Sequence, residues 1–293
     1  MSDEHPALAI RVDVDTREGV TKGIPIILEI LDKSSEIKAS FFLAMGPDHT
    51  GRNIRRILKF REFSKIHPKS LAQYSPRSLL SGIFLGRNCL DGSHMSIIKE
   101  ANRNGNEFGL HGYNHYYWAT HFRKLDNFQQ IDLLERGIRD FYYFMRERPT
   151  IFATPAFKWT KNLFFELDRR KFLCSGDFRF KKRIIMPFRL KFGSHVCSHL
   201  QLPVTYPLPS DLLLQGASEG AVIRQIVRRA KELIASSPFT GVFYIHAAIE
   251  PLRYQSLFKS IIAAFEHLGI RFLTFSQLTK EFAPQAPILS ISN

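Results

Sequence analysis

The chain has 293 residues, 44% of them hydrophobic, and a formal net charge of +14 at pH 7. A chain of this length and apolar content can bury a full core, which excludes a fibrous or disordered protein. No segment approaches the run of about 18–20 apolar residues that crosses a bilayer, so a transmembrane helix is also excluded. The three cysteines are widely separated and form no CxxC pair, which excludes a disulfide scaffold and favours a reducing compartment.

Short apolar segments alternate with amphipathic ones along the chain. The predicted strands are rich in β-branched and aromatic residues and comprise residues 8–14, 39–45, 107–110, 150–153, 172–174, 196–204, 242–246 and 271–274. The predicted helices between them include residues 23–33, 128–146, 220–236 and 257–268. Strands that alternate with helices form parallel sheets, so the order of elements predicts an α/β barrel or a doubly wound sheet.

Residues 46–98 separate the second and third predicted strands, which is too long for a loop between a strand and a helix. They are predicted to be an insertion, and residues 52–69 within it hold seven Lys or Arg residues against one Glu. Apolar residues recur among these cations at steps of three and four, as in an amphipathic helix.

The mixture of cations with bulky apolar residues favours a membrane-surface element. Nucleic-acid surfaces usually interleave cations with polar and small residues, so we expect an anionic membrane as a partner and no nucleic acid. An ordinary core helix and a nucleic-acid-binding segment are the alternatives. The residues predicted to contact the membrane or a substrate phosphate are Arg52, Arg55, Arg56, Lys59, Phe60 and Phe63.

Titratable side chains stand at the ends of several predicted strands. These residues are Asp13, Asp15, His111, His115, Asp177 and His246. The catalytic groups of α/β barrels lie at the carboxyl ends of the strands. These six residues are therefore candidate site residues. His111 and His115 are four apart, so on a helix or tight turn they can bind one cation if a third ligand comes from elsewhere.

Each of these residues also has a simpler interpretation. Asp13 and Asp15 could cap the end of a strand, and His246 could be a core histidine that hydrogen-bonds to the backbone. Asp177 could cap a turn.

The segment SHVCSH contains a second candidate set of metal ligands. It places His195, Cys197 and His199 on one face of a predicted strand. The sequence shows no carboxylate that would complete this set, so we treat it as the weaker of the two metal-binding patterns.

Five segments, in this order, resemble the motifs of the NodB-homology polysaccharide deacetylases, also called family 4 carbohydrate esterases. They are RVDVDT, GLHGYNH, RPTIFATPAF, CSGD and VFYIHA, and they span residues 11–247. Longer stretches, such as NEFGLHGYNHYYW and QLPVTYP, are similar to the ArnD-like branch, whose members act on N-acyl amino sugars carried on polyprenyl phosphate. The resemblance implies a distorted (β/α) barrel of about seven strands. It also implies one deacylase domain at 1–285, interrupted by the insertion at 46–98, with a tail at 286–293.

The resemblance further implies a set of metal ligands. Asp15, His111 and His115 would bind one divalent transition ion, with zinc favoured and manganese or cobalt as alternatives. Asp13 would accept a proton from the attacking water, and His246 would donate one to the departing amine.

Two further site residues come from the same comparison of motifs. Lys158 stands where the family has an arginine that pairs with the catalytic aspartate, so it would supply that charge. Asp177 would orient His246, or else cap its turn. Ala248 replaces a glutamate of the ArnD-like branch, which indicates that the sugar preference can differ.

We therefore expect a hydrolase that removes an acetyl or formyl group from an amino sugar on undecaprenyl phosphate. Its product would be a free-amine sugar for modification of lipid A or the cell envelope. Because the N-terminus carries no apolar export signal, we expect a peripheral protein on the cytoplasmic face of the inner membrane. The alternatives are a deacetylase of another glycan and a non-catalytic membrane-binding protein that retains the fold.

Overall fold

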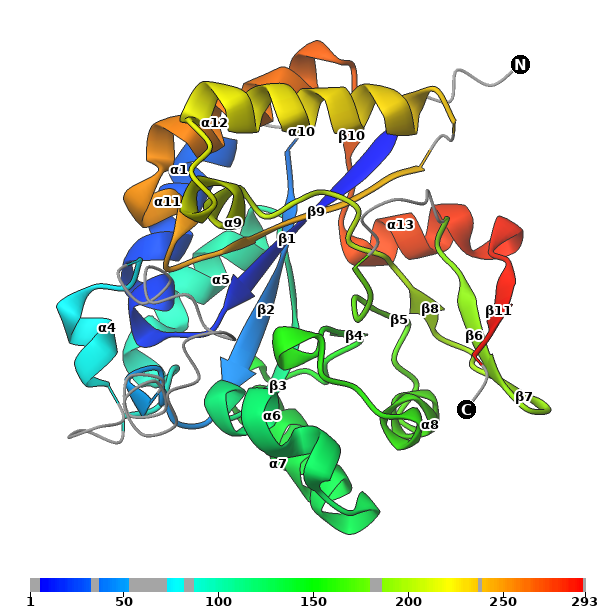
Figure 1. Cartoon of the computed structure of the whole chain (residues 1–293). Helices are drawn as coiled ribbons and strands as arrows, with labels where there is room; N and C mark the ends of the chain where they lie inside the picture. The colour runs from blue at the N-terminus through cyan, green and yellow to red at the C-terminus, as the bar shows by residue number, and fades with distance from the viewer. Residues whose placement is uncertain are drawn as a thin grey trace.

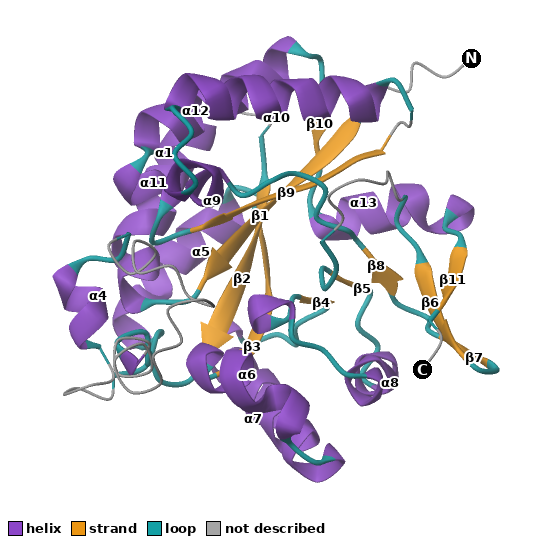
Figure 2. Ribbon diagram, in the orientation of Figure 1, coloured by secondary structure: helices purple, strands orange, loops and turns teal. Residues whose placement is uncertain are grey.

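The computed structural model describes residues 6–32, 37–52, 73–81, 87–179, 186–236 and 239–291. A parallel sheet runs through the molecule and helices cover its outer face (Figures 1 and 2). Its eight strands are β1 (Ala7–Val14), β2 (Ala39–Met45), β3 (Glu107–Tyr113), β4 (Ile151–Phe152), β5 (Cys174–Ser175), β8 (Leu200–Gln201), β9 (Phe239–His246) and β10 (Arg271–Phe272).

The strands follow the order β10-β1-β2-β3-β4-β5-β8, and β9 pairs with β1. A bridge between Val204, which follows β8, and Val242 of β9 brings the two sides of the sheet together. The sheet therefore curls into a distorted (β/α) barrel, and the predicted fold class is confirmed.

Strand β1 pairs with β2, β9 and β10 and is buried along its whole length. Alternate side chains point to opposite faces of a strand. Ile10, Val12 and Val14 belong to the large apolar cluster that the outer helices share. Arg11 and Asp13, also buried, therefore point into the barrel.

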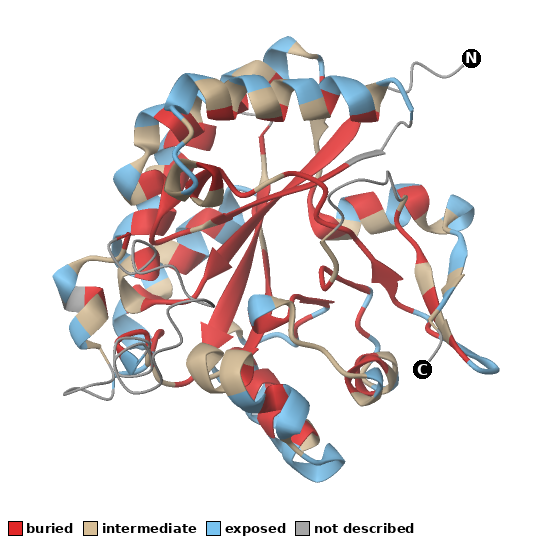
Figure 3. Ribbon diagram, viewed as in Figure 1, coloured by how far each residue is buried: buried red, intermediate tan, exposed pale blue. Residues whose placement is uncertain are grey.

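The outer helices are α1 (Ile24–Leu31), α5 (Met95–Arg103), α6 (His115–His121), α7 (Asn127–Met145), α8 (Lys161–Arg169), α9 (Pro209–Leu214), α10 (Glu219–Ile234), α11 (Glu250–Arg253), α12 (Gln255–His267) and α13 (Phe275–Phe282). Each long helix turns a buried stripe toward the sheet (Figure 3). In α10 the buried residues are Val222, Ile226, Ala230 and Leu233, whose spacing of three and four gives one apolar face.

A smaller three-stranded sheet lies beside α8 and contains β6 (Arg189–Phe192), β7 (His195–Val196) and β11 (Ile288–Ser290). The prediction of one strand at 196–204 was wrong, because β7 and β8 are separate strands joined by a turn. Backbone N–H groups of Ser198 and His199 donate to the Asp168 carboxylate instead of continuing a ladder. The segment predicted as a C-terminal tail contains β11, which pairs with β6.

The predicted insertion is described in part. Its helix α4 (Pro76–Leu80) is held to the segment after β1 by the Glu18 carboxylate, which accepts hydrogen bonds from the hydroxyls of Ser75 and Ser78. Arg52 is exposed. The other residues of the predicted membrane contact lie outside the described residues; they are Arg55, Arg56, Lys59, Phe60 and Phe63. Among helices in the described ranges, none combines the length and apolar character needed to cross a membrane.

Candidate active site

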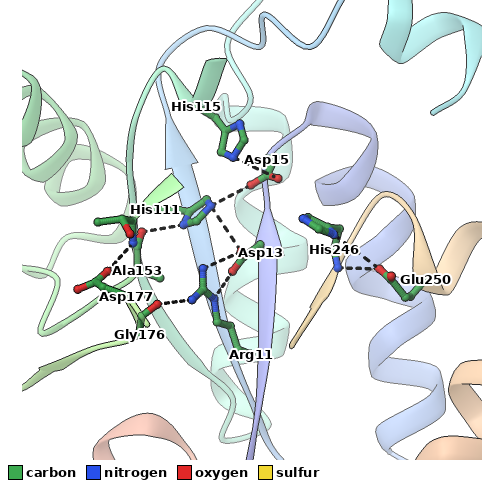
Figure 4. A network of polar contacts seen from close by, with 11 residues as sticks. Arg11, Asp13, Asp15, His111, His115, Ala153, Gly176, Asp177, His246 and Glu250 are labelled. Carbon is green, nitrogen blue, oxygen red and sulfur yellow. Dashed lines mark hydrogen bonds and ion pairs between the residues drawn. The ribbon is translucent and has the colours of Figure 1, made fainter. Parts of the chain in front are cut away.

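The candidate site lies at the carboxyl ends of β1, β3 and β9 (Figure 4). Asp13 is paired in register with His246 of the neighbouring strand, and Asp15 follows directly after β1. His111 belongs to β3, and His115 is the first residue of α6. Figure 4 shows His111 and His246 on opposite sides of the two aspartates. Residues from distant parts of the chain meet here because parallel strands end at the same edge of the barrel.

A tight turn between β3 and α6 sets the position of His115. Gly112 and Asn114 both have positive φ, at 67° and 52°. A Cβ atom on Gly112 would lie 2.9 Å from the Trp118 ring, so a side chain does not fit there. The Asn114 side chain accepts a hydrogen bond from the Tyr117 N–H and caps α6, so the helix begins at His115.

Asp15, His111 and His115 form a group that fits a divalent cation. Their ligand atoms lie within 4.8 Å of one another. The Asp15 carboxylate is 3.3 Å from Nε2 of His111 and 3.6 Å from Nε2 of His115. Asp15 Oδ1 and His111 Nε2 are buried and make no hydrogen bond within the described part of the chain, an arrangement that calls for a ligand.

The surroundings of His111 orient its ring and favour a positive charge beside Nε2. In the tautomer that carries its proton on Nδ1, this nitrogen donates a 2.7 Å hydrogen bond to the Ala153 carbonyl, and Nε2 faces Asp15 as a ligand atom for a cation. Burial would lower the pKa of His111, but Asp13 and Asp15 raise it overall. Burial lowers the pKa of His115. Burial would raise the pKa of Asp15, but the two histidines lower it overall, so the carboxylate is ionised.

Asp13 lies beside this group and is held by Arg11. Arg11 donates to both carboxylate oxygens of Asp13, from Nε at 2.6 Å and from Nη2 at 2.7 Å, and its Nη1 donates to the Gly176 carbonyl. Burial would raise the pKa of Asp13, but the charges of Arg11 and His111 lower it overall. Asp13 Oδ2 is 3.6 Å from Nε2 of His111, so an ionised carboxylate adjoins the candidate metal ligands.

The predicted role of Lys158 requires a correction. The cation that pairs with Asp13 is Arg11 of the same strand, and among the described residues Lys158 makes no ion pair with Asp13. Ala156 and Phe157 both have positive φ, and this turn places the Phe157 ring 5.0 Å from the Arg11 guanidinium carbon. The half-buried Lys158 contributes its carbonyl to a hydrogen bond from the Trp118 indole.

Asp177 lies across the site from His246 and holds the segment that follows β4 (Figure 4). Its Oδ1 accepts a 2.8 Å hydrogen bond from the Thr154 N–H. The carboxylate next to His246 belongs to Glu250, which is almost completely buried. Oε2 of Glu250 accepts a 2.8 Å hydrogen bond from the His246 N–H and lies 3.9 Å from its Nδ1.

Sequence reasoning missed Arg11 and Glu250, although each left a signal. Arg11 is two residues before Asp13, so the alternation of a strand puts both side chains on the same face. Glu250 is four residues after His246, beyond the motif that directed attention to the histidine.

The barrel and this set of carboxylates and histidines define a hydrolase of the carbohydrate deacetylase class. The family profile described as polysaccharide deacetylase matches residues 5–170, which is more than half of the chain. The chain therefore belongs to the polysaccharide deacetylase family and is an amide hydrolase of this family.

Individual proteins agree with this membership. A protein of Wigglesworthia glossinidia brevipalpis, named as the 4-deoxy-4-formamido-L-arabinose-phosphoundecaprenol deformylase ArnD, is 27% identical over 94% of this chain and 93% of its own length. The structure of a polysaccharide deacetylase from Mycobacterium smegmatis superimposes with a TM-score of 0.66 at 16% identity, covering 100% of this chain and 96% of that one. A family 4 acetyl xylan esterase from Clostridium thermocellum, in complex with a cobalt ion, gives a TM-score of 0.54 at 13% identity, covering 94% and 92%.

Proposed function

We propose that this chain is a metal-dependent deacylase that removes a formyl or acetyl group from an amino sugar carried on polyprenyl phosphate. The observation that carries the chemistry is the convergence of Asp15, His111 and His115 beside the ionised Asp13, with His246 next to Asp13 on the neighbouring strand. The carrier is inferred from the ArnD protein named above, whose similarity extends over nearly the whole chain.

Asp15, His111 and His115 would hold one divalent transition ion. Zinc is the ion that two imidazoles and one carboxylate suit best, and manganese and cobalt are alternatives. When bound, such an ion supplies Lewis-acid polarisation of the acyl carbonyl and of the attacking water.

The remaining steps belong to protein side chains. Asp13 accepts the proton of the attacking water, because its lowered pKa keeps it ionised at neutral pH. The two hydrogen bonds from Arg11 fix the carboxylate plane beside His111. His246, on the opposite side of the aspartates, donates a proton to the leaving amine.

Glu250 acts in this proposal as the positioning residue for His246. It holds the backbone of His246 by one hydrogen bond and presents its anionic oxygen 3.9 Å from Nδ1. Nδ1 is buried and has no hydrogen-bond partner in the described part of the chain. The Glu250 carboxylate therefore fixes the backbone of His246 and lies close to the free nitrogen of its ring.

The setting of the reaction follows from the substrate. A polyprenyl-linked sugar stays at the membrane, so we propose that the basic insertion binds the anionic surface of the inner membrane on its cytoplasmic side. The residues proposed for this contact are Arg52, Arg55, Arg56, Lys59, Phe60 and Phe63. The free-amine product would serve modification of lipid A or another envelope component.

The test is a parallel assay of three substrates with zinc-loaded full-length protein. They are undecaprenyl phosphate carrying a formamido pentose, undecaprenyl phosphate carrying an acetamido hexose, and a soluble chitooligosaccharide. Mass spectrometry would follow the free amine, with Asp13→Asn as the inactive control. We expect turnover of at least one lipid-linked sugar. Turnover of the chitooligosaccharide alone would refute the lipid-linked substrate, and no turnover of any amide would refute the deacylase.

A further inference from the structure

A second group of metal-ligating side chains lies outside the active site, where α8 meets the small sheet (Figure 1). Asp168 is near the end of α8, His195 begins β7, and Cys197 is in the turn that leads to β8. Each offers one ligand atom, and these atoms all lie within 4.8 Å of one another. The fold thus supplies the carboxylate that the SHVCSH segment lacks.

The distances are close to those of a metal site. His195 Nε2 is 3.0 Å from Asp168 Oδ2. Donor atoms bound tetrahedrally to zinc at about 2.0–2.3 Å are separated by roughly 3.3–3.8 Å. Side-chain movements of about one ångström would therefore be enough for the three ligand atoms to enclose an ion.

The surroundings of Asp168 hold its carboxylate in one orientation. Oδ1 accepts hydrogen bonds from the N–H and hydroxyl of Ser198, at 3.0 and 2.9 Å. It also accepts from the N–H and Nδ1 of His199, at 3.1 and 2.5 Å. These four donors surround Oδ1, while Oδ2 faces Nε2 of His195. Hydrogen bonds that fix a carboxylate in this way are typical of the groups behind a metal ligand.

The other two ligands are also placed by packing. Cys197 is fully buried, and the His195 ring stands edge-on against Phe165 of α8 with ring centroids 4.8 Å apart. The His195 side chain is 47% exposed, so the group opens to solvent on that side. An ion can enter there, and a water molecule can complete its coordination.

We propose that Asp168, His195 and Cys197 bind a second zinc ion, separate from the catalytic centre, that fastens the small sheet to α8. Zinc is favoured because a thiolate, an imidazole and a carboxylate together match its ligand preference. His199 is the residue behind the site that orients Asp168. The alternative is a purely hydrogen-bonded turn that takes up no metal.

The first measurement is zinc content after chelation, reloading with one to three equivalents of zinc, and dialysis of the full-length protein. We expect two zinc ions per wild-type chain, one in His195→Ala and one in His111→Ala. His267→Ala, which changes an exposed histidine at the end of α12, should keep two. A wild-type content of one that His195→Ala leaves unchanged would overturn the proposal.

Cobalt provides a readout that does not depend on the active site. The three residues proposed to hold the catalytic ion include no cysteine, so the thiolate-to-cobalt charge-transfer absorption that Cys197→Ser removes would report the second site. We expect this absorption in wild type and in His111→Ala, and its loss in Cys197→Ser and His195→Ala. Its absence from wild type at saturating cobalt would refute the second site and leave the proposed deacylase untouched.

Discussion

The two groups of metal ligands in this protein are built in different ways. At the active site, Asp15 and His111 come from the ends of long buried strands, and buried ligand atoms remain without hydrogen bonds within the described residues. At the second group, the Asp168 carboxylate accepts hydrogen bonds from the backbone N–H groups of Ser198 and His199 and so holds their turn in place. The positions of the active-site ligands are therefore set by the strands of the sheet. The positions of the second group depend on hydrogen bonds to the Asp168 carboxylate. We infer that changes at the first site affect chemistry and changes at the second affect stability.

The largest effect on activity is expected from removal of an active-site ligand. His111→Ala should lower the deacylation rate by about 10³-fold, because Lewis-acid stabilisation is worth several kcal/mol. Its thermal unfolding in chelator, compared with wild type, should show only the cost of losing a buried imidazole and its hydrogen bond to the Ala153 carbonyl. His195→Ala is the matched control and should retain most activity. Equal losses of activity in the two variants would contradict the inference that only the first site takes part in the chemistry.

Asp13→Asn tests the base separately from the metal. The amide keeps the shape of the side chain but accepts protons poorly, so the rate should fall by roughly 10²-fold or more. Zinc content should stay at the wild-type value, because Asp13 is not among the proposed ligands. If zinc is lost with activity, Asp13 and not Asp15 is the ligand from β1.

Asp168→Asn should affect stability more than activity. Hydrogen bonds to a charged group contribute about 1.5–3 kcal/mol, so in chelator at pH 7 we expect a loss of about 2 kcal/mol. Denaturant unfolding would measure it, with Asp132→Asn on the exposed face of α7 as the control. A loss of activity without a loss of stability would contradict this assignment.

The same variant predicts a dependence on pH. Burial would raise the pKa of Asp168, but hydrogen bonds from His199 and His195 lower it overall. A lowered folded pKa stabilises the fold above the ordinary Asp value of about 3.9, and this stabilisation is lost as the pH falls through the folded pKa. The stability difference between wild type and Asp168→Asn should therefore be full above pH of about 5 and shrink in acid. A stability difference that grows in acid would show that folding raises the pKa of Asp168 instead of lowering it.

The smallest effect distinguishes Arg11 from Lys158. Arg11→Lys keeps the charge but loses the fork on Asp13, so kcat/KM should fall by about tenfold. Lys158→Ala should change it by less than about threefold. Steady-state kinetics on one amide substrate would compare them, after thermal unfolding has shown that both variants fold. A larger loss of kcat/KM in Lys158→Ala than in Arg11→Lys would indicate that Lys158 supplies the charge beside Asp13, as the motif comparison implied.

The order of elements predicted a parallel sheet and most of its strands, because buried parallel strands leave apolar runs, and the resemblance to a known family selected the barrel over the doubly wound sheet. The sequence also predicted which strand ends carry titratable groups, since parallel strands place their carboxyl ends together. It did not identify Asp168 as a neighbour of His195, because the two meet only through the packing of α8 on the small sheet. Arg11 was overlooked because a motif elsewhere, ending at Lys158, offered a cation for Asp13.

The most direct test of the account is a crystal structure of the zinc-loaded protein with anomalous diffraction recorded at the zinc absorption edge. We predict a strong peak within about 2.0–2.3 Å of Asp15, His111 and His115, with Asp13 beside it and held by Arg11. A second peak should lie among Asp168, His195 and Cys197. A map with no peak at the first position, at full zinc loading, would contradict the central claim that these strand ends form the catalytic metal centre.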